Sequence, residues 1–135
     1  MTYSTDFAKL WFKLTKEIRL HLESELAPSL TEGQLHVLEY LLQHERIKPS
    51  DLIEYLATTP AAVTTILDRM EKNGLIERER DKQDRRIVWI HVTPRGREEA
   101  GRGLEIRNRF IHSYLNRLSS RNQQLLVYLL GKVSS

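Results

Sequence analysis

The sequence contains no cysteine among its 135 residues. Disulfide bridges, zinc sites built on thiolates and thiol-based redox sensing are therefore excluded for this chain. Long hydrophobic runs are also missing, since no stretch approaches the roughly 20 apolar residues of a membrane span. The first residues carry charges every few positions, unlike a secretory signal peptide. We therefore expect a soluble, cytoplasmic protein with no membrane partner.

Patterns that would support enzymatic chemistry are absent as well. The sequence shows no nucleophile paired with a base, no glycine-rich loop that could cradle phosphates, and no metal motif. None of the histidines has the His-x-x-x-His spacing of a helical zinc site. They are His21, His36, His44, His91 and His112. The sequence therefore predicts no enzyme, no metal site and no cofactor.

The net charge is only +3, and the excess of basic residues lies in the middle of the chain. Residues 46–97 contain 11 Lys and Arg against 8 Asp and Glu, while the rest of the chain holds 10 of each. A solvated surface with uneven charge would give the same pattern. The imbalance is therefore weak support for a polyanionic partner.

Apolar residues at three- and four-residue steps predict amphipathic helices at both ends of the chain. The first helix ends before Pro28, and its stripe is Phe7, Leu10, Trp11, Leu14, Ile18, Leu22 and Leu26. Thr93-Pro94 begins a long helix with Ala100, Leu104, Ile111, Leu115 and Leu118. A last helix follows Ser119-Ser120, with Leu125, Leu126, Leu129, Leu130 and Val133. Gly101 and Gly103 are expected to weaken and bend the long helix.

Capping signals divide the segment between these helices. Thr31 and Gln34 have the spacing of a capping box, which starts a helix at Glu32. A short helix runs from Pro49 through Leu56, and a further helix begins at Thr59-Pro60 and stops at Asn73-Gly74. Residues 75–80 and 86–92 are rich in β-branched residues and flank a charged turn, which predicts a hairpin.

Two short helices followed by a basic hairpin are the order of a winged helix, whose second helix enters the major groove of DNA. Within residues 60–73, Val63, Ile66, Leu67 and Met70 form the buried side. The other side presents Ala61, Thr64, Thr65, Asp68 and Lys72, with Arg69 at its flank. Small and hydroxyl side chains allow close approach to base edges. An ordinary solvated helix face would show the same residue types, so this helix alone does not distinguish a DNA-binding face from a solvated one.

The hairpin carries a concentration of basic side chains: Arg78, Arg80, Lys82, Arg85 and Arg86. A thin basic protrusion can enter the narrow, electronegative minor groove. Asp81 and Asp84 alternate with these residues, and a carboxylate can hold an arginine extended toward DNA. The alternative for such a pair is a weak surface ion pair.

The segments LTEGQLHVLEYL and KPSDLIEYLATTPAAVTTILDRMEKNGLIERERDKQDRRIVWIHVTPRG resemble the MarR family of transcription regulators over residues 31–96. The matching signals are LDRMEKNGLIERER, the wing DKQDRR, and VTPRG at the start of the next helix. By this resemblance Asp84 and Arg86 form the family's wing Asp-x-Arg pair, in which Arg86 reads the minor groove and Asp84 positions it. Arg85 is an additional basic group. Pro60 departs from the small or polar residue of many relatives, so base contacts are not transferred.

The resemblance implies a mainly α fold with a small β-hairpin wing, formed by a single domain over residues 1–135. Residues 31–93 would be the DNA-binding winged helix-turn-helix lobe, and residues 1–28 and 94–135 the dimerisation helices. The implied function is a homodimeric, sequence-specific regulator of duplex DNA, a repressor at an inverted-repeat operator, with a small-molecule effector as in some relatives. The alternatives are a transcription activator and a winged helix that docks on protein through its hairpin.

These expectations assign two sets of residues. The DNA-binding set is Thr59, Ala61, Ala62, Thr64, Thr65, Asp68, Arg69, Lys72, Arg78, Lys82, Asp84, Arg85 and Arg86. The dimerisation set is Phe7, Trp11, Leu14, Ile18, Ile111, Leu115, Leu125, Leu126, Leu129 and Leu130, although the same stripes could pack within one chain. Trp11, Trp89 and Phe110 are candidates for lining an effector cavity or for ordinary core, and no effector residue is assigned.

Overall fold

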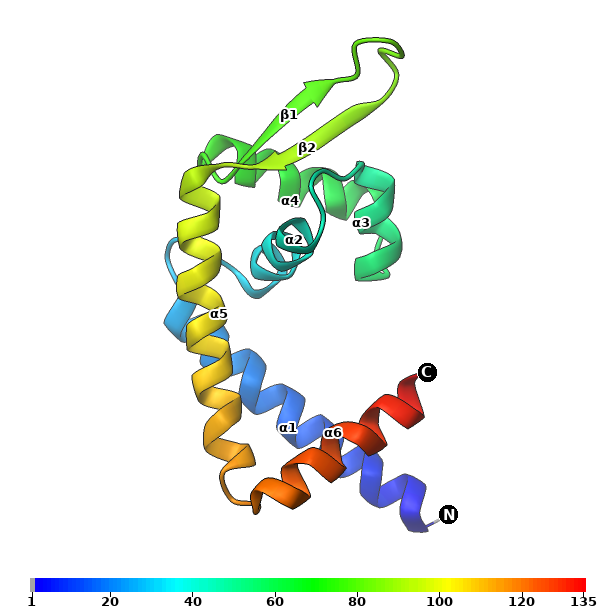
Figure 1. Ribbon diagram of the computed structural model, residues 1–135, viewed down its shortest axis with the longest axis vertical. Helices are drawn as coiled ribbons and strands as arrows, with labels where there is room; N and C mark the ends of the chain where they lie inside the picture. Colours follow the sequence, from blue (N-terminus) through cyan, green and yellow to red (C-terminus); the bar gives the residue numbers. More distant parts are fainter. Residues whose placement is uncertain (1) are drawn as a thin grey trace.

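The computed structural model describes residues 2–135, which form six helices and one antiparallel pair of strands (Figure 1). The elements are α1 (Thr2–Leu26), α2 (Glu32–Gln43), α3 (Pro49–Leu56), α4 (Pro60–Lys72), β1 (Ile76–Arg80), β2 (Val88–Val92), α5 (Pro94–Leu115) and α6 (Ser120–Ser134). The predicted mainly helical fold with a hairpin wing is confirmed. Of the helices in this part of the chain, none combines the length and apolar character needed to cross a membrane.

The helices begin where the sequence places caps. The Thr31 hydroxyl accepts a hydrogen bond from the Gln34 N–H at 3.2 Å, and the Gln34 side chain accepts one from the Thr31 N–H at 3.2 Å. The hydroxyls of Thr59 and Thr93 accept backbone N–H groups in the first turns of α4 and α5 at 3.1 and 3.0 Å. Each cap satisfies a backbone donor that the helix leaves unpaired, so its loss costs about 1 kcal/mol.

The hydrophobic core lies in one lobe of the molecule, between α2, α3, α4, the base of the hairpin and the adjoining ends of α1 and α5. Val63, Leu67 and Met70 are buried as predicted, and Ile66 is half-buried. The linker between α2 and α3 pairs with β2 through Ile47 and Ile90, whose backbone groups exchange hydrogen bonds of 3.3 and 2.8 Å. The hairpin is thereby fixed to the linker between α2 and α3.

Close backbone packing explains two of the glycines in α5. A Cβ added at Gly96 would lie 2.1 Å from the carbonyl oxygen of Leu75. A Cβ at Gly103 would lie 2.7 Å from Cδ1 of Leu35, within the core. Helix α5 is continuous from Pro94 to Leu115 in spite of these glycines. Of the two glycines expected to weaken this helix, Gly103 is therefore a position of close contact with α2, whereas Gly101 has no atom within 4 Å of an added Cβ.

Polar side chains connect α5 to the two helices beside it. The Arg102 guanidinium donates to the carbonyl oxygen of Leu26 at 3.1 Å and to the Ser29 hydroxyl at 2.6 Å, which satisfies the C-terminal end of α1. Arg107 donates two hydrogen bonds of 2.8 Å to the Glu39 carboxylate on α2. This arginine holds the pKa of Glu39 below its ordinary value, although partial burial opposes the shift. Arg102 thus attaches α5 to the end of α1, and Arg107 attaches α5 to α2 in the winged lobe.

Candidate nucleic-acid interface

Helix α4 presents its predicted polar face to solvent. Thr59, Ala61, Thr64, Thr65, Asp68, Arg69 and Lys72 are exposed, and Ala62 is half-buried. These side chains lie opposite the buried residues of the same helix, as a period of 3.6 residues requires. The amphipathic prediction for α4 is confirmed, and the exposed side is free to approach a base-pair edge.

The threonine hydroxyls on this face point back to their own helix. Thr64 donates to the carbonyl oxygen of Pro60 at 3.0 Å, and Thr65 donates to that of Ala61 at 3.1 Å. Thr59 is occupied as the N-cap. Because these hydroxyl protons are used internally, Thr64 and Thr65 offer their surroundings a methyl group and acceptor lone pairs. Such groups fit thymine methyl groups and exocyclic amino groups in a major groove.

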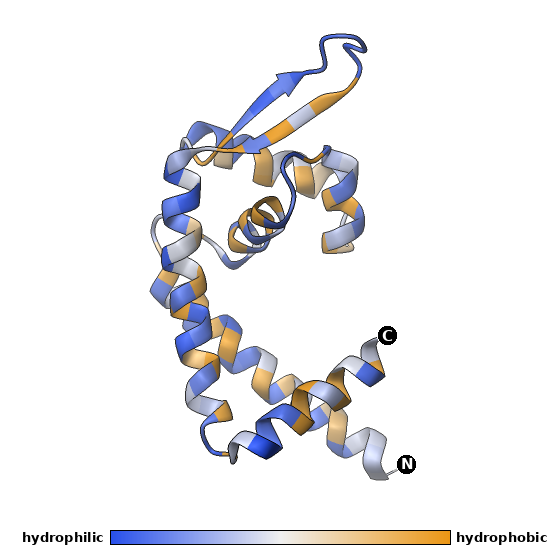
Figure 2. Cartoon of the chain, viewed as in Figure 1, coloured by the Kyte–Doolittle hydropathy of each residue, from blue (hydrophilic) through white to orange (hydrophobic). Residues whose placement is uncertain are grey.

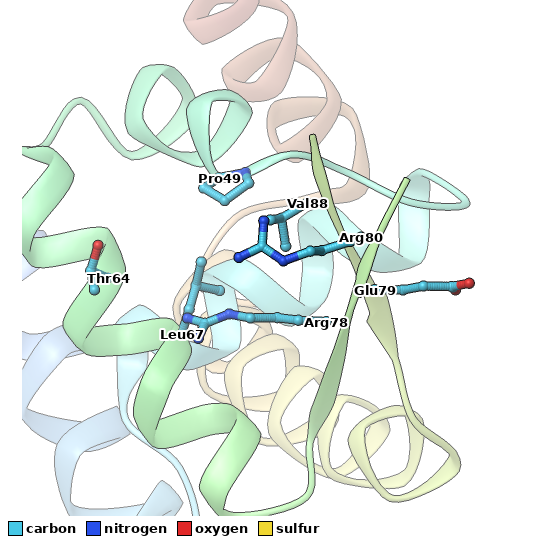
Figure 3. Close-up of a pocket in the computed structure, with 7 residues that line it drawn as sticks. All are labelled: Pro49, Thr64, Leu67, Arg78, Glu79, Arg80 and Val88. Carbon is cyan, nitrogen blue, oxygen red and sulfur yellow. The ribbon is translucent and has the colours of Figure 1, made fainter. Parts of the chain in front are cut away.

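The hairpin has two chemically different faces. The register pairs Ile76 with Val92 and Arg80 with Val88, so alternate side chains share a face. Figure 3 shows the side chains of Arg78 and Arg80 directed toward α4, while Glu79 points away from it. The basic residues of β1 therefore face α4.

Asp84 and Arg86 form the pair that the sequence predicts. The Asp84 carboxylate accepts from Nε and Nη2 of Arg86 at 3.0 and 3.1 Å, and from its backbone N–H at 3.1 Å. These bonds, led by the side-chain pair, lower the pKa of Asp84 and raise that of Arg86. The Arg86 side chain is 91% exposed. A two-point contact therefore fixes the orientation of a guanidinium that stands in solvent.

Lys82 and Arg85 are also exposed in the wing turn, whereas Asp81 has a different role from the one considered for it. The Asp81 carboxylate accepts from the indole N–H of Trp89 at 3.0 Å and from two backbone N–H groups in the turn. Its pKa is lowered, first by the Trp89 donor and then by the backbone donors. Asp81 therefore holds the shape of the turn and does not orient an arginine.

Arg46 was missed by sequence reasoning. Its guanidinium lies 3.9 Å from the ring centroid of Trp89, and the Lys48 ammonium lies 5.9 Å from the same ring. The linker between α2 and α3 thus adds positive charge beside the wing. The only local signal was the basic pair flanking Ile47, because the partner ring is more than forty positions away along the chain.

Two members of the predicted DNA-binding set pair with each other. Arg78 on β1 donates to the Asp68 carboxylate on α4 at 2.8 Å and approaches Glu71 at 3.5 Å. The side chain of Arg78 is only 26% exposed, whereas that of Asp68 is 59% exposed. This contact joins β1 at the base of the wing to α4, so the two elements are held at a fixed spacing.

An open groove of about 420 Å³ separates α4 from the hairpin (Figure 3). Its lining includes Pro49 from α3, Thr64 and Leu67 from α4, Arg78 and Arg80 from β1, and Val88 from β2. Arg80 donates to the carbonyl oxygen of Arg85 at 2.8 Å across the turn. The groove therefore combines apolar walls with arginine side chains directed inward.

The predicted dimerisation residues lie on α1, α5 and α6, where Figure 2 shows apolar bands along α1 and α6. Phe7 and Trp11 are 49% and 50% exposed, and Leu125 and Leu129 are 50% and 48% exposed. Leu14, Leu126 and Leu130 are exposed as well, and Ile18, Ile111 and Leu115 are half-buried. Seven of these ten side chains are thus left uncovered within one chain. Intramolecular packing does not account for them.

The aromatic residues considered for an effector site do not share a cavity. Trp11 lines an apolar hollow between α1, α5 and α6, Trp89 lies beneath Arg46, and Phe110 stacks on His21 with centroids 3.9 Å apart. Among residues 2–135, no three His, Asp or Glu side chains gather as a metal site would require. The geometry assigns no residue to an effector.

Comparisons with known proteins point to transcription regulators, in agreement with the exposed face of α4 and the basic wing. The model of the MarR family matches residues 30–88. The chain is 30% identical to the helix-turn-helix transcriptional regulator YwhA of Bacillus subtilis, over 92% of this chain and 87% of that protein. It is also 30% identical to the transcriptional repressor MdtR of the same organism, over 84% and 73%. A mutant MarR from E. coli complexed with operator DNA has a TM-score of 0.80 at 25% identity, covering 95% of this chain and 93% of that one.

Proposed function

Because this chain belongs to the MarR family, whose members are DNA-binding transcription regulators and not enzymes, we propose that it is a homodimeric repressor of an inverted-repeat operator. The observation that carries the proposal is that the polar face of α4 and the basic hairpin lie side by side and are both exposed. The small and hydroxyl side chains of α4 are exposed beside a hairpin whose Arg86 is exposed and bound at two points by Asp84. A cytoplasmic location follows from a chromosomal target.

In the proposed complex, α4 lies in a major groove and the wing lies in the flanking minor groove. Thr64 and Thr65 would contact base edges, while Arg69 and Lys72 reach phosphates at the flank of the helix. Arg86 would read the narrow minor groove. The other predicted residues on α4 and the wing would support these contacts.

The dimer is supported by the apolar residues that α1 and α6 leave in solvent. Trp11 and Leu125 are both half exposed, as are their neighbours on the same stripes. Contiguous apolar patches of this kind are rare on monomers and are covered in oligomers. Two copies related by a two-fold axis would present their recognition helices to half-sites about 34 to 36 Å apart.

Repression is supported by the likeness to MdtR, which is a repressor, and it requires only that the bound dimer obstruct polymerase. A small-molecule effector that relieves repression is supported by the family alone. Its site would need the second copy to be in place, since the described aromatic side chains lie in separate hollows.

The test combines mass, footprint and transcription. Light scattering at micromolar concentration should give twice the mass of one chain, and footprints on recovered genomic fragments should show two inverted half-sites. Deleting the gene should raise transcription from the bound promoters. A monomer that binds tightly to single half-sites would refute the dimer. Lower transcription after deletion would identify an activator instead.

A further inference from the structure

The groove between α4 and the hairpin lies where the proposed complex must place a DNA strand. A major groove and the minor groove beside it share one sugar-phosphate backbone. If α4 occupies the first and the wing the second, that backbone passes between them. A groove of about 420 Å³ lies at that place, bounded by α4, the start of α3 and the inward face of the hairpin (Figure 3).

The two arginines that line this groove differ in whether a nearby carboxylate neutralises their charge. The guanidinium of Arg78 is compensated by Asp68 at 2.8 Å and Glu71 at 3.5 Å. Arg80 has no carboxylate within 4 Å among residues 2–135, and its hydrogen bond goes to the neutral carbonyl oxygen of Arg85. A guanidinium carries five N–H donors, so most donors of Arg80 remain available.

The other residues that line the groove offer no further positive charge to an anionic partner. The Thr64 hydroxyl donates to the carbonyl oxygen of Pro60, so it presents acceptor lone pairs to the groove. Leu67 and Val88 are apolar. Glu79 also lines the groove, but its side chain points away from α4 (Figure 3). Arg80 is the cation in this groove that can accept an anionic partner without first breaking an ion pair.

We propose that Arg80 binds a backbone phosphate of the DNA strand that crosses between the recognition helix and the wing. This inference rests on the proposed function and adds a binding residue beyond the predicted set. The contact would be independent of base sequence, because the phosphate groups are the same at every base pair. It would set how far α4 and the wing reach into their two grooves by anchoring the strand that separates them.

The first measurement compares the salt dependence of duplex binding among three variants and the wild-type dimer. Arg80→Gln keeps side-chain bulk but removes the charge, and should weaken operator binding about tenfold or more. With one contact in each half-site, the slope of log affinity against log salt should fall in magnitude by about two. Arg80→Lys should retain the slope. Arg19→Gln removes the same charge from α1, far from the hairpin, and should change neither quantity (Figure 1).

The second measurement replaces single phosphates of the operator by uncharged methylphosphonates. Wild-type protein should lose affinity at one phosphate per half-site, between the major-groove contacts and the flanking minor groove. Arg80→Gln should lose little more at that position, since the contact is already missing. If Arg80 only braced the wing turn through Arg85, the variant would be as sensitive to that replacement as the wild type, which would overturn the inference.

The outcomes separate this inference from the proposed function. Failure of the wild-type protein to bind any duplex would overturn both. Wild-type binding with an unchanged salt slope in Arg80→Gln would overturn the phosphate contact alone and leave the regulator intact. Random duplex DNA supplies a further check, because Arg80→Gln should weaken operator and random binding by the same factor.

Discussion

The glycines of α5 give a graded stability series, because the structure places them in three different environments. Gly101 has no atom within 4 Å of an added Cβ, Gly103 has Leu35 at 2.7 Å, and Gly96 has the Leu75 carbonyl oxygen at 2.1 Å. Helix propensity alone would make each change to alanine favourable by about 1 kcal/mol. Packing should preserve that gain at Gly101 and reverse it at the other two.

The size of each stability change depends on which atoms must move to make room for the new methyl group. At Gly103 the obstacle is a buried leucine, and overpacking of this kind costs about 1 to 3 kcal/mol, so Gly103→Ala should lower the free energy of unfolding by up to about 2 kcal/mol. At Gly96 the obstacle is backbone, whose position is fixed by the 3.1 Å hydrogen bond from Thr93 to Leu75. Gly96→Ala should therefore cost about 3 kcal/mol or more.

Urea unfolding followed by far-UV circular dichroism measures the series. All variants should be compared at one protein concentration, because the proposed dimerisation would make apparent stability depend on it. Leu35→Ala provides a partner for a double-mutant cycle. Its cost should be smaller in the Gly103→Ala background, since the new methyl group occupies part of the space that the leucine leaves. Equal stabilisation by Gly101→Ala and Gly103→Ala would refute the packing argument.

Three further predictions concern the wing and the attachment of the lobe. Arg86→Ala should weaken operator binding and lower the magnitude of the salt slope by about one for each phosphate that Arg86 neutralises. Asp84→Ala should have the same effects in milder form, and the double variant should lose less binding free energy than the two single losses added together. Unchanged operator binding of both single variants across a salt titration would contradict the wing assignment. Trp89→Phe removes the indole donor that holds the turn, so hydroxyl-radical protection of the flanking minor groove should weaken while major-groove protection persists. Because Arg107 lowers the pKa of Glu39, that carboxylate stabilises the fold at neutral pH and loses this contribution as the pH falls below the ordinary glutamate pKa; Glu39→Gln should flatten the acid limb of a stability profile.

The sequence by itself determined the elements and their order. Thr31, Thr59 and Thr93 mark helix starts because a cap is a contact between residues three positions apart, and that spacing is visible in the chain. The alternation of buried and exposed residues in α4 was readable for the same reason. The Asp84–Arg86 pair lies two residues apart, so its geometry was also accessible.

Only the tertiary structure decided which distant side chains meet. The sequence placed Asp68 on the exposed face of a helix and Asp81 among the basic residues of the hairpin, but it gave neither partner. The structure pairs Asp68 with Arg78 across ten positions and Asp81 with Trp89 across eight. Gly101 and Gly103 looked alike as helix-weakening residues, and they differ only because the core leucines of α1, α2 and the linker between them pack against Gly103. Arg80 was one of five basic residues of the hairpin, and only the fold showed that it lies in the groove with no carboxylate within 4 Å among residues 2–135. Local patterns fix backbone conformation through near neighbours, whereas the partner of a side chain is chosen by how the elements pack.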